Sequence, residues 1–181
     1  MFARSGIYGQ FHDNDALTMW PIIILVFVTI QRLIELVIAK RNTAALLTMG
    51  AREVGAAHYP LLVAFHTVWI LGLWILARGQ TIYWPLIIVF ALLQAMRIWV
   101  LATLGKSWTT RIIVLPEKPL VVGGPFKYMN HPNYAVVALE IFVLPLAFGL
   151  ISFAIIGGVI NLGILAYRIH IEEAALGPKR A

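Results

Sequence analysis

The chain contains no cysteine and few charged residues. The absence of cysteine excludes disulfides, a Cys-ligated zinc site and a thiol nucleophile. Charged residues make up only 12% of the 181 residues, whereas soluble proteins have about 25%. Together with 61% hydrophobic residues and a mean hydropathy of +0.87, this composition indicates an integral membrane protein.

Motifs of soluble nucleotide-binding folds are also missing. No G-x-G-x-x-G follows a strand pattern, and neither a P-loop lysine nor a serine nucleophile elbow is present. The net charge of +6 arises in short segments between apolar runs, rather than on one helical face. We therefore expect a lipid bilayer, and no nucleic acid, as the partner of this chain.

Apolar runs predict the helices. Residues 20–39, 57–77 and 83–103 are each about as long as a membrane crossing requires. Two shorter runs, 134–149 and 151–167, are separated near Gly149 and predict a short, tilted or re-entrant hairpin. The expected fold class is an all-α integral membrane protein of about five helices, in a single domain spanning residues 1–181.

Basic residues predict the orientation. Lys40 and Arg41 follow the first run, and Lys106 and Arg111 follow the third. Two crossings separate these groups, so they belong on the same face of the membrane. The positive-inside rule makes that face cytoplasmic, and we expect a multi-pass protein of a prokaryotic cytoplasmic membrane.

The segment between the third run and the hairpin has a different pattern. β-branched residues at 109–115 and 120–122 flank a turn with Pro116 and Pro119. This pattern is typical of a short β-ribbon or an extended loop.

Two polar motifs flank the hairpin. The first is GPFKYMNHPNY at residues 124–134, in which His131 precedes a proline and is expected to cap a helix that begins at Pro132. Such a helix start suits an anionic ligand, although a plain capped helix is an equally open interpretation. The second is RIHIEE at residues 168–173, which places Arg168 and Glu172 on one helical face at the membrane boundary, where ionisable groups are expensive.

Other ionisable residues lie within the apolar runs. Arg32 and Glu35 are spaced as a pair within one helix, and Arg97 is expected to snorkel toward the loop after residue 103, with substrate contact as the alternative. Glu140 is either a catalytic carboxylate or the partner of an arginine, Arg168 or Arg97. No metal site is expected: His58 and His66 are more than two helical turns apart, too far for one ion.

Both motifs, in this order and with apolar helices between them, resemble the isoprenylcysteine carboxyl methyltransferase family of integral membrane enzymes. The resemblance implies an S-adenosylmethionine site that faces the cytoplasm and is built from residues 105–134 and 168–176. It further implies that Arg168 faces the methyl acceptor. Arg97 is a second candidate for binding the acceptor, and the candidate catalytic residues are Arg168, with Glu172 or Glu140 as the base for a phenolic acceptor. The implied cofactor-binding residues are Lys118, Pro119, Leu120, Val121, Phe126, His131, Pro132, Asn133, Tyr134 and Glu172.

The stretch LGKSWTTRIIVLP at residues 104–116, with Glu140, is more similar to a bacterial branch whose members O-methylate alkylpyrones and alkylresorcinols. The expected acceptor is thus a prenylcysteine-type carboxylate or a phenolic lipid, entering from the bilayer. Three other interpretations stay open at this point: a phospholipid N-methyltransferase, an NADPH-dependent membrane reductase, and a non-enzymatic scaffold.

Overall fold

The computed structural model describes residues 7–116 and 119–180, with side chains described for residues 19–116 and 119–176. Five α-helices form this part of the chain: α1 (Ile7–Thr48), α2 (Tyr59–Leu76), α3 (Trp84–Leu104), α4 (Pro132–Ala147) and α5 (Ile151–Arg180). The connections contain two short strands, β1 (Arg52–Val54) and β2 (Ile112–Val114). They also contain three 3-10 helices, η1 (Ala56–His58), η2 (Gly105–Ser107) and η3 (Gly124–Lys127).

Four helical segments in the described part are long and apolar enough to cross a membrane: Met19–Thr48, Ala56–Leu76, Trp84–Ser107 and Ile151–Leu176. The predicted class, an all-α multi-pass membrane protein, is confirmed. The predicted short hairpin is only half right, because α4 has 16 residues whereas α5 has 30. The fifth run and the motif at residues 168–173 belong to one continuous helix, since no glycine or proline interrupts the chain where apolar residues give way to polar ones.

The first helix is also longer than predicted. The basic residues Lys40 and Arg41 were expected to mark its end, but α1 continues to Thr48 and stops just before Gly50, whose φ is +87°. A membrane boundary does not end a helix, because the backbone hydrogen bonds continue in water until a residue favours another conformation.

The turn between α4 and α5 follows the predicted break. Gly149 has a φ of +72°, and the amide of Leu150 donates to the carbonyl of Pro145 at 2.9 Å. This backward bond closes the end of α4 and is the kind that requires a left-handed residue, usually glycine. The chain then reverses directly into α5.

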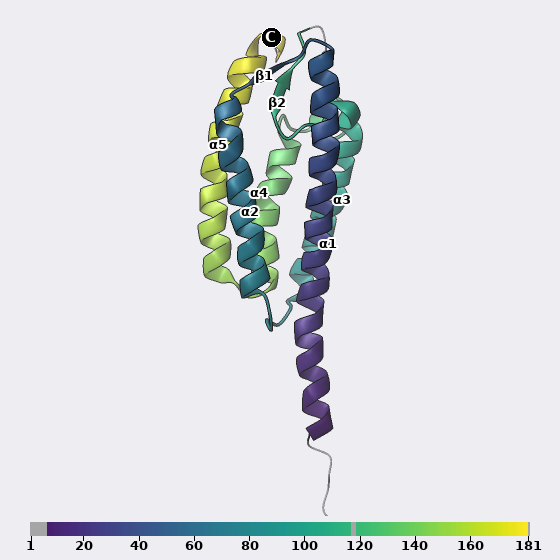
Figure 1. Cartoon of the computed structure of the whole chain (residues 1–181), viewed down its shortest axis with the longest axis vertical. Coiled ribbons are helices and arrows are strands. Elements are labelled where there is room, and N and C mark those ends of the chain that lie inside the picture. The colour runs from purple at the N-terminus through teal and green to yellow at the C-terminus, as the bar shows by residue number, and fades with distance from the viewer. Residues whose placement is uncertain (1–6, 117–118, 181) are drawn as a thin grey trace, which may run out of the picture.

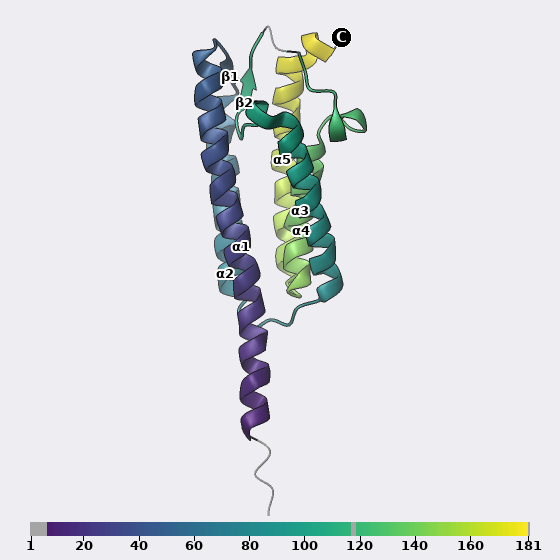
Figure 2. The ribbon, with the colours of Figure 1, turned by 90° about the vertical axis from the view of Figure 1, so that its right-hand side faces the viewer.

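All five helices run roughly along the long axis of the molecule (Figure 1), and the turned view of Figure 2 separates them into two groups. In Figure 2, α1 and α2 lie on one side, and α3, α4 and α5 lie on the other. The two groups share a core that includes Leu25 of α1, Leu73 of α2, Phe90 of α3 and Leu144 of α4. Within residues 19–48 of α1, most other apolar side chains are exposed, as expected where the surrounding solvent is lipid.

The strands, the loop after α3 and the C-terminal end of α5 gather at one end of the bundle (Figure 1). Antiparallel pairing of β1 with β2 joins the loop after α1 to the loop after α3, with Glu53 opposite Ile113. Residues 109–122 were expected to form a short ribbon or an extended loop. Residues 112–114 do form a strand, but its partner is β1, and residues 119–122 form no strand. The salt bridge from Arg111 to Glu53, at 2.8 Å, adds an attraction between the two loops that the sequence pattern did not reveal.

Candidate functional site

The site begins at the N-terminus of α4. His131 is the N-cap residue with φ −129°, and Pro132 occupies the first turn. The amides of Tyr134 and Ala135 donate to the carbonyl of His131 at 3.1 and 3.2 Å. The predicted helix start is confirmed, and its cause is local: proline disfavours helical geometry in the residue before it but suits the first turn itself.

The Tyr134 hydroxyl joins the two polar motifs. Arg168 Nε donates a hydrogen bond to this hydroxyl at 2.7 Å, and the hydroxyl donates to a carboxylate oxygen of Glu172. Arg168 and Glu172 lie one turn apart on α5, as their spacing predicts, and Tyr134 of α4 bridges them. The three side chains form a chain of a cation, a hydroxyl and an anion.

His131 packs against the hydrogen-bonded side chains of Tyr134 and Glu172. Its ring stacks on that of Tyr134, with centroids 5.3 Å apart and an interplanar angle of 13°. Its nitrogens lie 3.8 Å from Glu172 and 3.3 Å from Glu173. Two carboxylates therefore lie next to the N-terminus of α4, and the site has both cationic and anionic groups.

A residue from the opposite helix group also reaches Arg168. His58, at the start of α2, is buried, and its Nε2 lies 3.4 Å from Arg168 NH1. Its Nδ1 contacts the carbonyl of Gly55. A carbonyl can only accept, so Nδ1 carries the hydrogen and Nε2 accepts from the guanidinium. From the sequence, His58 was considered only as a metal ligand, and its separation of 110 residues from Arg168 gives no signal of this contact.

Two cavities meet at these side chains. The loop cavity, of about 160 Å³, lies between the segment of residues 104–134 and the last turns of α5. The interhelix cavity, of about 310 Å³, is lined by residues from all five helices. The residues common to both walls are Trp108, Thr109, Asn133, Tyr134 and Arg168.

Six of the ten residues expected to bind a cofactor line the loop cavity: Phe126, His131, Pro132, Asn133, Tyr134 and Glu172. Pro119, Leu120 and Val121 are not among its lining residues. Lys118 lies outside the described residues. The sequence reasoning singled out neither Trp108 nor Thr109, although both fall within the segment 105–134 that it assigned to the site.

Two polar atoms in the shared wall have no partner. Oδ1 of Asn133 and Nε1 of Trp108 are buried and, within the described part of the chain, make no hydrogen bond. Buried polar groups are almost always paired, so exceptions call for an explanation. One acceptor and one donor in the wall of a cavity are what a polar ligand would satisfy.

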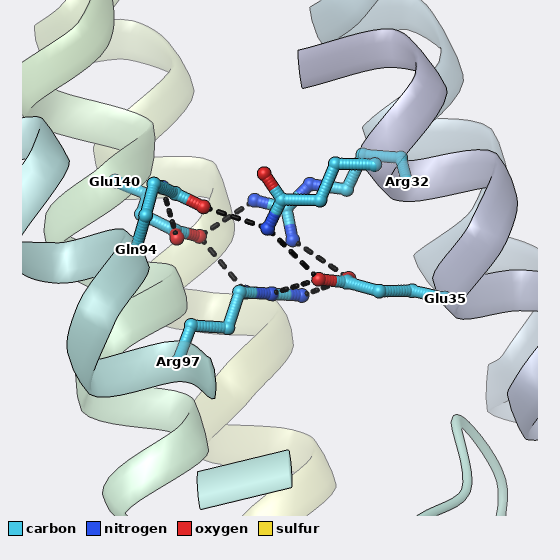
Figure 3. A network of polar contacts seen from close by, with 6 residues as sticks. Arg32, Glu35, Gln94, Arg97 and Glu140 are labelled. Carbon is cyan, nitrogen blue, oxygen red and sulfur yellow. Dashed lines mark hydrogen bonds and ion pairs between the residues drawn. The ribbon is translucent and has the colours of Figure 1, made fainter. Parts of the chain in front are cut away.

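Deeper in the bundle lies an ion-pair network of Arg32, Glu35, Arg97 and Glu140 (Figure 3). Arg97 donates to Glu35 at 2.6 and 2.7 Å and to Glu140 at 2.9 Å, and Arg32 donates to Glu140 at 2.6 Å and to Glu35 at 3.1 Å. Gln94 also donates to Glu140, at 2.7 Å. Two arginines and two carboxylates make the network neutral, and they connect α1 to α3 and α4.

This network corrects the expectation for Arg97. Its guanidinium does not snorkel toward the loop, because all three of its nitrogens donate to carboxylates inside the bundle and the residue is only 6% exposed. The predicted Arg32–Glu35 pair is present. Of the two partners considered for Glu140, Arg97 is the one it contacts; Arg32, which was not considered, is the other. Glu140 is fully buried, and both of its oxygens already accept hydrogen bonds.

Comparison with known proteins supports the family resemblance of the two polar motifs. The model of the isoprenylcysteine carboxyl methyltransferase family matches residues 86–178, which include both polar motifs. A Bacillus subtilis protein named YpbQ, described as uncharacterized, is 36% identical over 159 residues, covering 85% of this chain and 95% of the relative. An uncharacterized protein of Haemophilus influenzae is 32% identical over 156 residues, covering 80% of this chain and 88% of the relative. No solved structure matches the chain.

Proposed function

Because the chain belongs to the isoprenylcysteine carboxyl methyltransferase family, and so to the membrane methyltransferases, we propose that it transfers a methyl group from S-adenosylmethionine to an oxygen of a lipophilic acceptor. The observation that carries this proposal is the meeting of two cavities at Tyr134 and Arg168. One cavity lies among polar loop residues, and the other lies among membrane helices. A water-soluble donor and a lipid acceptor need such an arrangement, since each must reach the same point from a different phase.

The residues of the loop cavity fit the donor. S-adenosylmethionine carries two cationic groups, a carboxylate and a base with hydrogen-bond donors and acceptors. Glu172 offers a carboxylate, Asn133 an unpaired acceptor and Trp108 an unpaired donor, all in the wall of this cavity. We assign these three residues to cofactor binding, together with His131, which stacks on Tyr134.

The interhelix cavity suits the lipid acceptor. Leu33 and Leu36 of α1 and Val63 of α2 line it and are exposed. We infer that the cavity opens sideways between α1 and α2, where lipid would surround the protein. An acceptor could enter with its tail in the bilayer and its oxygen toward Arg168.

The bound cofactor would supply an electrophilic methyl group, so that the chain needs only to orient and to assist the attacking oxygen. Arg168 would hold a carboxylate acceptor by charge, or stabilise the phenolate of a phenolic one. A phenol, with a pKa near 10, must also lose its proton, and we propose Glu172 as the base, acting directly or through the hydroxyl of Tyr134. Glu140 is the weaker candidate because arginines and Gln94 occupy both of its oxygens.

Titration calorimetry with S-adenosylhomocysteine tests the cofactor site. The detergent-purified protein should bind saturably, and Glu172→Gln should weaken binding by roughly 10–100-fold, the worth of a hydrogen bond to a charged group. Glu173→Gln is the matched control: it is the next residue on α5, its side chain is 51% exposed, and it lines neither cavity. This change should leave affinity within about threefold.

Failure of the folded wild-type protein to bind S-adenosylhomocysteine would contradict the proposal. Equal weakening by both substitutions would show instead that the last turns of α5 act only through their net charge. Binding of NADPH in the same assay would favour a reductase.

A further inference from the structure

The interhelix cavity has polar side chains at a second place, away from Tyr134 and Arg168. Arg32 of α1 and His66 of α2 both line it, on the two helices between which the cavity opens. Polar groups inside a membrane are expensive and mark sites of function more often than polar groups at a surface. The proposed function makes no use of these two residues.

Arg32 has hydrogen-bonding capacity to spare. Of the five N–H groups of its guanidinium, one donates to Glu35 and one to Glu140. Its side chain is 21% exposed, whereas those of Glu35, Arg97 and Glu140 are 8%, 7% and 1% exposed. Arg32, Glu35 and Arg97 all line the interhelix cavity, and the side chain of Arg32 is the most exposed of the three.

His66 offers the complementary group. Its Nδ1 lies 2.9 Å from the carbonyl of Leu62. Since the carbonyl can only accept, Nδ1 carries the hydrogen and Nε2 presents a lone pair. Among the residues that the structure describes, none donates to this nitrogen. His66 lines the same cavity as Arg32 and Arg97 of the network.

The distance from the proposed reaction centre follows from helix geometry. His58 contacts Arg168, and His66 lies eight residues further along the same helical stretch, which corresponds to about 12 Å. Tyr134 and Glu140, the partner of Arg32, are six residues apart on α4, or about 9 Å. Arg32 and His66 therefore lie about 9–12 Å from the Tyr134 hydroxyl, a distance that part of a lipid tail can span.

We propose that Arg32 and His66 form a subsite for a hydroxyl group on the tail of the acceptor lipid, about 9–12 Å from the oxygen that is methylated. A hydroxyl can accept from Arg32 and donate to Nε2 of His66 at once. A carbonyl would leave Nε2 unpaired, and a carboxylate would add charge to a network that is already neutral. The subsite rests on the proposed function, because it specifies the acceptor of the same site.

The test compares a 5-alkylresorcinol that has a plain chain with a series of analogues, each of which has one chain hydroxyl placed about 9–12 Å from a ring hydroxyl. Their affinities for the detergent-purified protein are measured by calorimetry, with and without S-adenosylhomocysteine. The best hydroxylated analogue should bind roughly tenfold more tightly than the plain lipid, the worth of about one net hydrogen bond. His66→Phe should abolish this preference and leave the affinity for the plain lipid within about twofold.

Two further variants separate the hydrogen bond from shape. His66→Gln keeps an acceptor and should retain part of the preference. Thr67→Val removes a neighbouring hydroxyl that lines the same cavity but donates to the carbonyl of Val63 at 2.8 Å, and it should retain all of the preference. Unchanged S-adenosylhomocysteine binding shows that each variant is folded.

A wild-type protein that binds all of the lipids equally, or none of them, would overturn the subsite. So would a preference that survives His66→Phe. If the wild-type protein does not bind S-adenosylhomocysteine, the proposed function is overturned instead. The preference for the hydroxylated lipid can still be measured in that case, because the lipid affinities are also determined without S-adenosylhomocysteine.

Discussion

Replacement of Glu140 by leucine tests whether the ion-pair network stabilises the bundle. Glu140 is fully buried and accepts hydrogen bonds from Arg32 at 2.6 Å, Gln94 at 2.7 Å and Arg97 at 2.9 Å. Glu140→Leu leaves two arginines to share Glu35, with one uncompensated positive charge inside the membrane bundle. Removing one partner of a buried ion pair lowers the free energy of unfolding by about 3–5 kcal/mol, and we expect a loss in this range.

The double variant Glu140→Leu/Arg97→Met is the matched comparison. It restores neutrality and leaves the Arg32–Glu35 pair, which is 3.1 Å apart. Because apolar replacement of a whole buried pair is often neutral or stabilising, the double variant should be more stable than Glu140→Leu alone. We expect it within about 2 kcal/mol of the wild type.

The free energies come from titration of the purified protein in nonionic micelles with sodium dodecyl sulfate, followed by far-UV circular dichroism. The six tryptophans provide a second probe, whose agreement tests two-state behaviour. A loss below about 1 kcal/mol for Glu140→Leu, typical of a surface site, would refute the reasoning. A double variant as unstable as the sum of the two single variants would also refute it, because the two charges would then not be coupled.

Two further predictions concern helix packing and the acceptor site. Gly158→Ala should lower the free energy of unfolding by about 1–3 kcal/mol in the same titration, because an added Cβ would lie 2.0 Å from the ring of Phe142. The control Gly163→Ala should be neutral or slightly stabilising, because nothing lies within 4 Å of its added Cβ. Equal effects of the two substitutions would contradict the packing of α4 on α5. Arg168→Ala should lower the rate of methyl transfer to a lipid acceptor by roughly 100-fold and leave the affinity for S-adenosylhomocysteine nearly unchanged, since Arg168 is assigned to the acceptor oxygen. An equal loss of both would assign it to the cofactor as well.

Several features of this protein were predictable because their causes are local. The long apolar runs predict the spans of α1, α2 and α3, and the glycine at position 149 predicts the turn after α4. The start of α4 at Pro132 follows from the geometry that proline imposes on its neighbours. The two polar motifs could also be assigned to one family, because they keep a characteristic order along the chain.

Other features were missed because a local pattern leaves two outcomes possible. The basic residues Lys40 and Arg41 fit both the end of a helix and its continuation into water, and α1 continues. β-branched residues at 112–114 predict a strand but not its partner, which is β1, about 60 positions earlier in the chain.

The membrane class, the positions of most helices and the residues of the two polar motifs follow from the amino-acid sequence, because each depends on neighbours within a few turns. The pairing of Arg97 with residues 43 and 62 positions away, and the contact of His58 with Arg168 across 110 positions, arise only when the helices pack together. These contacts depend on how each helix is rotated and packed against the others. Inside a membrane a charged group must find a partner, but which partner it finds is set by packing.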